Sequence, residues 1–146
     1  MPRIKLEMPE NYVFSTKIDI RVSDINYGNH LGNDALVSLL HEARIRFLNN
    51  LGYSELDIEG HGIIMSDLIV IYKAQVFHGE TVRIDINIQD FTRKTCDIYY
   101  KVSKAGNNLV ARCKTTITFF DYSAQKPVSI PPQFTDKIKK MNFISL

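Results

Sequence analysis

The chain contains one long stretch with helical periodicity, and almost everything after it alternates with the two-residue period of a strand. From 34 to 51, apolar residues recur every three or four positions, which predicts an amphipathic helix of about five turns. Asn33 is expected to cap its start, and Gly52 is expected to end it. Strands are predicted before the helix at 13–22 and after it at 62–74, 81–89, 96–102 and 109–119.

The order is therefore one strand, one long helix and about four antiparallel strands. At 62–74, Ile, Leu and Val occupy both parities, which is typical of a strand covered on both faces. The residues 104–108 form a hairpin signal, and 133–141 is predicted as a short terminal helix. A single apolar-striped helix and one curved antiparallel sheet can bury each other. We therefore predict an α+β domain over 1–146 whose sheet wraps around a central helix, the hot-dog fold.

Charge and composition exclude several classes of protein. The 18 basic and 16 acidic residues give a net charge of +2, so a dedicated nucleic-acid binder is not expected. No run approaches the roughly 18 apolar residues that span a bilayer, and the polar first ten residues do not resemble a signal peptide. Cys96 and Cys113 make neither a disulfide framework nor a zinc motif. We expect a cytoplasmic protein without a membrane contact, metal or cofactor.

Polar side chains are concentrated in the loop between the first strand and the helix. Its sequence from 23 to 34 is Ser-Asp-Ile-Asn-Tyr-Gly-Asn-His-Leu-Gly-Asn-Asp. Such a loop places these groups beside a helix N-terminus, where free backbone N–H groups and the helix dipole favour negative charge. Those N–H groups could polarise a thioester carbonyl and stabilise the oxyanion that forms when it is attacked.

This loop, followed by Glu42-Ala-Arg44, resembles the signature of 4-hydroxybenzoyl-CoA-type and related acyl-CoA thioesterases, which is Asp-x-Asp-x-x-Gly-His-x-Asn-Asn and then Glu-Ala-Arg. The resemblance continues through 72–80, 115–121 and 126–131, and so covers about 13–135. It implies a hot-dog enzyme that hydrolyses acyl-CoA or acyl-carrier-protein thioesters. It also implies a homodimer or homotetramer, because such enzymes build their sites between subunits.

One departure from this signature concerns the catalytic group. Asn26 stands where the 4-hydroxybenzoyl-CoA type has its catalytic carboxylate, and an amide can be neither nucleophile nor general base. Asn26 could orient water or the carbonyl while Asp34 or Asp67 acts as base. Asp67 interrupts an apolar run, so we expect its pKa to be raised. Alternatively, His30 could activate water directly, or hydrolysis could have been lost.

Several charged and polar residues are candidates for substrate binding, and each also has a structural interpretation. Asp24 and Asn33 could contact the substrate or simply cap the loop and the helix. Glu42 and Arg44 are expected to form pairs on the helix face or at a subunit interface. The candidates for phosphate contacts, which could equally form a solvent face, are Arg93, Lys94, Arg112 and Lys114.

Two further functions stay open. Hot-dog enoyl-CoA hydratases use Asp-x-Asn-x-x-His, whereas Asp24, Asn26 and His30 have one extra residue in their spacing. A non-catalytic acyl-thioester-binding module would keep the pocket without the base. Asn26 favours that alternative, whereas His30 and Asp67 argue against it.

Overall fold

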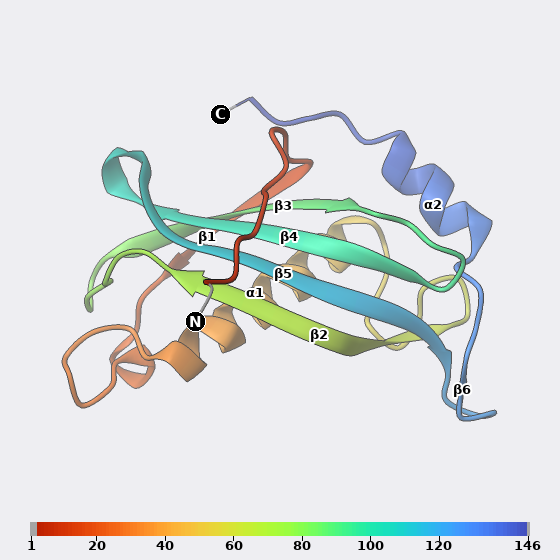
Figure 1. Ribbon diagram of the computed structural model, residues 1–146, viewed down its shortest axis with the longest axis horizontal. Helices are drawn as coiled ribbons and strands as arrows, with labels where there is room; N and C mark the ends of the chain where they lie inside the picture. Colours follow the sequence, from red (N-terminus) through yellow and green to blue (C-terminus); the bar gives the residue numbers. More distant parts are fainter. Residues whose placement is uncertain (1–2, 146) are drawn as a thin grey trace.

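The computed structural model describes residues 3–145, and it confirms the predicted α+β hot-dog fold, in which a curved antiparallel sheet wraps around one long helix (Figure 1). The strands are β1 (Phe14–Asp19), β2 (Gly62–Tyr72), β3 (Thr81–Gln89), β4 (Thr95–Lys104), β5 (Asn108–Asp121) and the short β6 (Lys126–Pro127). The helices are α1 (Asn33–Asn50) and α2 (Pro132–Lys139), with single turns at Val22–Asp24 and Ala105–Asn107.

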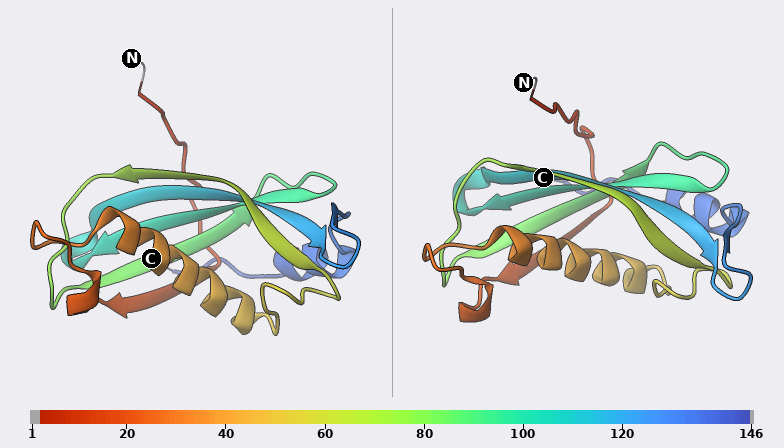
Figure 2. Two further views of the ribbon diagram at one scale, coloured as in Figure 1. Left: turned by 90° about the horizontal axis from the view of Figure 1, so that it is seen from below. Right: turned by 60° about the horizontal axis from the view of Figure 1, so that its bottom comes forward.

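The sheet runs in the order β1-β3-β4-β5-β2, and β6 pairs with β5. Every pairing is antiparallel, as the hairpin signal at 104–108 predicts for β4 and β5. Figure 2 shows the sheet curving over α1, which lies along its concave face. The core forms where the alternating apolar residues of the strands meet the helix stripe, and its largest fully buried side chains include Leu36, Leu40, Phe47, Ile84, Ile86, Ile98 and Ile117.

The start of α1 differs by one residue from the prediction. Gly32, not Asn33, is the N-cap, with an extended backbone at φ −70° and ψ 151°. The N–H group of Gly32 donates to the carbonyl oxygen of Asp24 at 3.0 Å, and its own carbonyl accepts from Leu36 at 3.0 Å. Asn33 is therefore the first helical residue, and its N–H group belongs to the turn that has no intrahelical acceptors. At the other end, Gly52 has φ +84°, which suits a helix stop.

The strand β2 lies at the edge of the sheet. The prediction that it is covered on both faces is wrong for the single chain, because the middle of the strand is exposed. Among the described residues, no strand pairs with the outer edge of β2 (Figure 1). Met65, Leu68 and Tyr72 are 40%, 43% and 45% exposed. Part of the apolar surface of β2 therefore has no cover within one copy of the chain, although Ile63 is buried.

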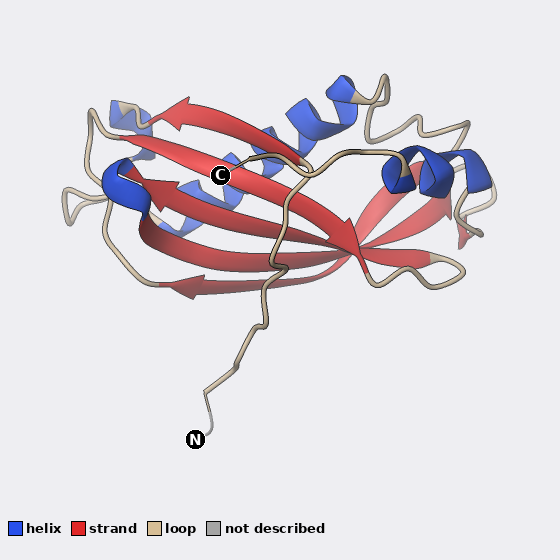
Figure 3. Cartoon of the chain, turned by 90° about the horizontal axis from the view of Figure 1, so that it is seen from above, coloured by secondary structure: helices blue, strands red, loops and turns tan. Residues whose placement is uncertain are grey.

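On the convex face of the sheet, the C-terminal segment crosses the segment that precedes β1 (Figure 3). Tyr12 is buried, and its carbonyl oxygen accepts a hydrogen bond from the N–H group of Ile144 at 2.8 Å. Phe134 of α2 is also buried and packs against Tyr53 and Phe119 at one end of the sheet. Within residues 3–145, neither helix has the length and hydrophobicity needed to cross a membrane.

Candidate active site

The loop before α1 is held by hydrogen bonds of its own residues. The buried carboxylate of Asp24 accepts the backbone N–H of Arg21 at 2.9 Å and lies 3.3 Å from its guanidinium group. The backbone N–H of Asn26 donates to the carbonyl oxygen of His30 at 2.9 Å, which closes the loop. The Asn26 side-chain oxygen accepts from the N–H group of Gly28 at 2.8 Å. Asp24 therefore caps the loop, which was the structural alternative to substrate binding.

The imidazole of His30 is fixed by its neighbour in the chain. Its Nδ1 lies 3.1 Å from the carbonyl oxygen of Leu31. Because a carbonyl oxygen only accepts, Nδ1 carries the proton of the neutral ring and Nε2 is left as a basic nitrogen. A methyl group on Gly28 would lie 3.1 Å from this Nε2 and 3.2 Å from the side-chain oxygen of Asn26. The loop thus brings Asn26 and His30 together over Gly28, as predicted.

Gly32 brings a third predicted residue to the same place. A Cβ atom at Gly32 would meet a carboxylate oxygen of Asp34 at 2.7 Å and the Cβ of Asn26 at 3.5 Å. The Asp34 side chain therefore folds back over the start of α1, where a carboxylate is favoured by the helix dipole. Asn26, His30 and Asp34 therefore pack closely around the backbone of two glycines, where a Cβ atom would meet their side chains.

Residues 72–76 and the start of α1 line a neighbouring cavity of about 330 Å³, whose lining includes His30 but neither Asn26 nor Asp34. The N–H group of Leu31 donates to the carbonyl oxygen of Val76 at 2.7 Å, which ties the loop to this segment. The hydroxyl of Tyr72 donates to the carbonyl oxygen of Asn33 at 3.0 Å. The cavity is lined by His30, Leu31, Gly32, Asn33, Leu36, Tyr72, Lys73, Ala74, Gln75, Val76 and Val110.

Tyr72 and Lys73 line this cavity but were not predicted as site residues. Burial and, to a smaller extent, the neighbouring Cys113 and Asp34 raise the pKa of Tyr72, so its hydroxyl stays protonated and can donate. The available signal was their place at the start of the 72–80 segment, which resembles the family pattern. Nothing in that pattern by itself says that the segment folds against the loop.

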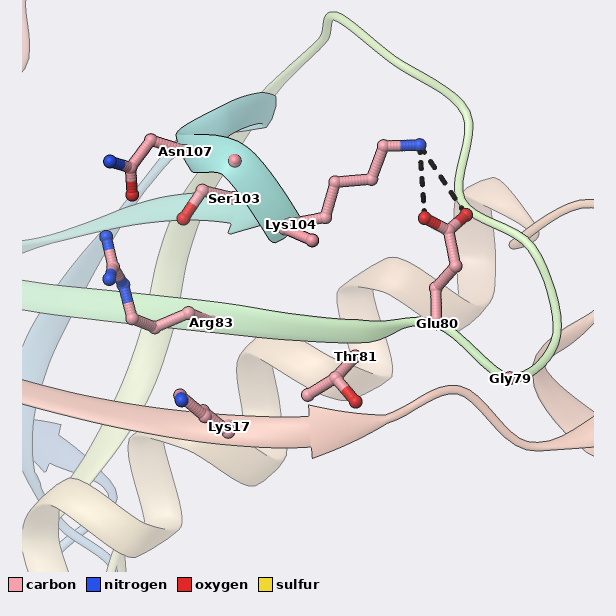
Figure 4. Close-up of a pocket in the computed structure, with 10 residues that line it drawn as sticks. Lys17, Gly79, Glu80, Thr81, Arg83, Ser103, Lys104 and Asn107 are labelled. Carbon is pink, nitrogen blue, oxygen red and sulfur yellow. Dashed lines mark hydrogen bonds and ion pairs between the residues drawn. The ribbon is translucent and has the colours of Figure 1, made fainter.

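A second, larger cavity of about 460 Å³ lies on the other side of the same segment (Figure 4). There, the ammonium group of Lys104 lies 3.4 Å from a carboxylate oxygen of Glu80 and donates to the carbonyl oxygen of Gln75 at 2.8 Å. Figure 4 shows this pair on one side of the cavity and the side chains of Arg83 and Lys17 on the other. The cavity contains none of the polar loop residues, and its ion pair anchors the segment that lines the first cavity.

Asp67 does not have the environment that the sequence predicted. Its side chain is 48% exposed and pairs with Lys114 at 2.9 Å. It also accepts the backbone N–H of Thr116 at 2.9 Å. Burial alone would raise the pKa of Asp67, but the hydrogen bonds from Lys114 and Thr116 outweigh it and lower the pKa below its ordinary value. The expectation of a raised pKa is therefore wrong, and Asp67 is a poor general base.

This ion pair gives a prediction for the acid side of the pH scale. Because the pKa of Asp67 is lower in the folded state, its contribution to stability is present above its unfolded pKa and is lost as the pH falls through the folded pKa. Lys114→Met is expected to raise the pKa of Asp67 toward its ordinary value. A pH titration followed by the carboxyl carbon signal in NMR measures this change, with Lys17→Met on β1 as the matched control. An equal Asp67 pKa in both variants would contradict the assignment.

The predicted phosphate contacts lie away from the loop. Arg93 and Lys94 precede β4, and their carbonyl groups bond to Ile130 and Phe119. The nine residues of β3 separate them from the loop end of the sheet by about 30 Å. Arg112 and Lys114 do share one face of β5, as alternation predicted, but Lys114 is engaged by Asp67. Within one chain, Arg93 and Lys94 cannot contact a ligand held by His30.

The two residues of the Glu-Ala-Arg motif pair separately. Glu42 accepts from Arg46 at 2.7 Å on the helix face, as expected. The Arg44 side chain is buried; it donates to Glu55 at 2.8 Å and to the hydroxyl of Tyr100 at 3.1 Å. A buried charge of this kind requires such partners, and removing one of them is costly. The Arg44 pair lies within the fold of the chain, on the side of α1 that faces the sheet.

Residues 20–138 match the family model described as the thioesterase-like superfamily. Solved structures with the same fold include Slr0204, a 1,4-dihydroxy-2-naphthoyl-CoA thioesterase from Synechocystis (TM-score 0.80, 16% identity, covering 87% of this chain and 96% of that one). They also include a DHNA-CoA thioesterase from Staphylococcus aureus (TM-score 0.77, 21% identity, covering 86% of this chain and 88% of that one). A Thermus thermophilus thioesterase complexed with coenzyme A and Zn is similar to the same degree (TM-score 0.77, 19% identity, covering 90% of this chain and 95% of that one). A search of curated proteins found no match.

Proposed function

Because this chain belongs to the thioesterase-like superfamily, we propose that it hydrolyses acyl-CoA or acyl-carrier-protein thioesters with an activated water. The observation that carries the proposal is the cavity at the start of α1. It combines a fixed imidazole, that of His30, with the first turn of a helix, which begins at the exposed Asn33. These are the two elements that water attack on a thioester requires, a general base and an oxyanion site.

The mechanism follows from the placement of these groups. We place the thioester carbonyl oxygen at the N–H group of Asn33, where the helix dipole stabilises the negative charge that develops. Nε2 of His30 takes a proton from a water molecule as its oxygen attacks the carbonyl carbon. The tetrahedral intermediate collapses with cleavage of the C–S bond, and the imidazolium returns the proton to the leaving thiolate. The Asn26 amide orients the water, and Asp34 stabilises the imidazolium or acts as the base in place of His30.

We further propose that the working form is a homo-oligomer built on the outer edge of β2. An unpaired edge strand presents free backbone groups, and proteins normally cover such an edge. Met65, Leu68 and Tyr72 add exposed apolar side chains along the same strand. A second copy pairing antiparallel with β2 would cover both, and it would bring its own residues to the neighbouring cavities. A dimer of this kind also offers the route by which Arg93 or Lys94 of another subunit could reach the substrate.

The cavity at the start of α1 also offers a charged contact for the arm that carries the acyl group. Lys73 lines the cavity and can contact the phosphates or amides of a coenzyme A or carrier-protein arm.

Both cysteines are buried and free, and burial raises the pKa of both thiols, that of Cys113 to about 12. Unreactive free thiols are typical of proteins from a reducing compartment, so we place the protein in the cytoplasm.

The test is release of free thiol by the purified protein from a panel of short, medium, long-chain and aromatic acyl-CoAs. We expect turnover of at least one substrate with equal amounts of thiol and free acid. Conversion of enoyl-CoA to hydroxyacyl-CoA without thiol release would instead identify a hydratase. Binding of acyl-CoA with neither reaction would mean that the pocket is kept and the base is lost.

A further inference from the structure

A third cavity, of about 410 Å³, lies between α1 and β2. Helix and strand run in opposite directions here, since Tyr72 at the end of β2 contacts Asn33 at the start of α1. The helix side of this cavity runs from Val37 through Leu40 to His41 and Arg44, and the strand side runs from Leu68 to Met65. The first and third cavities therefore lie in sequence along one groove between α1 and β2 that starts at the proposed thioester site.

The polarity of the groove changes along its length. Near the thioester site, the apolar lining residues are Leu36, Val76 and Val110 in the first cavity and Val37 and Leu40 after them. The polar lining residues beside Val37 and Leu68 are the exposed Ser38 and the half-exposed Asp67, which pairs with Lys114. One helical turn further, polar groups from three elements appear together: His41 and Arg44 from α1, Ser66 from β2 and Thr115 from β5. The apolar section of the groove thus ends at a polar floor.

This floor is a connected network whose charges already have partners. The carboxylate of Glu55 accepts from Nε2 of His41 at 2.6 Å and from Arg44 at 2.8 Å. Arg44 also donates to the hydroxyl of Tyr100, which lies 3.2 Å from the hydroxyl of Thr115. Burial alone would raise the pKa of Glu55, but the bonds from Arg44 and His41 outweigh it and lower the pKa, so the carboxylate stays charged.

We propose that the network of His41, Glu55 and Arg44 sets the maximum length of the acyl group, so that short and medium acyl chains are accepted and long ones are not. This inference rests on the proposed function, because it takes the first cavity as the thioester site. An alkyl chain gains free energy while it displaces water from apolar walls. Beyond them, it would strip water from an ion pair and an imidazole without offering a hydrogen bond in return, which is unfavourable.

The length of the apolar section can be estimated from the rise of α1. His41 is eight residues beyond Asn33, which corresponds to about 12 Å along the helix axis at 1.5 Å per residue. An extended alkyl chain advances roughly 1.3 Å per carbon, given C–C bonds of about 1.5 Å. The apolar section therefore accommodates an acyl group of about eight to ten carbons.

The test uses S-alkyl-CoA thioethers, which cannot be hydrolysed, and measures their dissociation constants by calorimetry below their micelle concentrations. In the wild type, we expect affinity to rise roughly threefold to fourfold for each added methylene up to octyl, from about 0.8 kcal/mol per CH2. Dodecyl and hexadecyl thioethers should bind no more tightly than octyl. A steady rise through hexadecyl, or failure of every thioether to bind, would overturn the proposal.

Variants of His41 locate the limit. His41→Leu makes the floor apolar and should tighten dodecyl binding by about tenfold while leaving butyl binding unchanged. His41→Gln keeps a hydrogen-bonding side chain and should restore the wild-type limit. Asn50→Leu is the control, because it also introduces a leucine in place of a polar side chain but does so at the exposed C-terminal end of α1. An unchanged ratio of dodecyl to octyl affinity in His41→Leu would also overturn the proposal. Because no step depends on turnover, absence of thioester hydrolysis would contradict only the proposed function.

Discussion

His30→Ala is expected to lower kcat/KM for the best acyl-CoA substrate by about 100-fold or more, which is the usual contribution of a general base. The reason is geometric. The carbonyl of Leu31 fixes the proton on Nδ1, and no other imidazole lines the cavity within the residues that the structure describes. The loss should fall mainly on kcat, because His30 acts on the attacking water and not on the coenzyme A arm.

The measurement is steady-state thiol release, with thermal unfolding to verify that the variant is folded. His78→Ala, in the exposed part of the 73–80 segment and outside the cavity lining, is the control and should retain wild-type kinetics. Wild-type activity in His30→Ala would show that His30 is not the base. In that case, Asp34→Asn should abolish turnover, since Asp34 is the remaining carboxylate at the start of α1.

Leu68→Glu is expected to convert the oligomer into a 16.8 kDa monomer and to remove most of the thioesterase activity. Burying one leucine contributes about 1.5–3 kcal/mol, and in a two-fold symmetric interface the substitution acts twice. The dimer dissociation constant should therefore rise at least about 100-fold, even before repulsion between two carboxylates is included. Activity should fall with it if, as we propose, the site lies between subunits.

Sedimentation velocity over a range of concentrations measures the change in assembly. Leu56→Glu introduces the same charge at a leucine that is 72% exposed but lies outside β2, and it should leave the assembly intact. An unchanged sedimentation coefficient in Leu68→Glu would place the interface elsewhere on the molecule. A monomeric but fully active Leu68→Glu variant would show that one chain carries the complete site.

The sequence was sufficient to predict the elements of the fold, because helical and two-residue periodicities do not overlap in this chain. In both β3 and α1, the apolar residues that set the periodicity are the ones that are buried in the core. Two errors have physical causes. Asn33 was expected to cap α1 from its residue type, but the contact between Gly32 and Asp24 moves the cap by one residue. The apolar β2 was expected to be covered, although its proposed cover belongs to another copy of the chain.

The site was only partly predictable, because its residues meet through tertiary contacts. Asn26, His30 and Asp34 are close in sequence, and the loop does bring them together. Asp67 was expected to be buried because its neighbours in sequence are apolar. The hydrogen bonds that lower its pKa come from β5, nearly fifty residues away. The contribution of Glu55 to the polar floor had no sequence signal, since it lies in the connector after α1.

The central claim is that this protein hydrolyses thioesters with water. The most direct test is reaction of the wild-type protein with an α,β-unsaturated acyl-CoA in heavy-oxygen water, followed by mass spectrometry of the products. We expect one labelled oxygen in the carboxylate of the released acid and an equal amount of free coenzyme A. Label on the β-carbon of an intact thioester, or recovery of unreacted substrate from this and every other acyl-CoA, would contradict the claim.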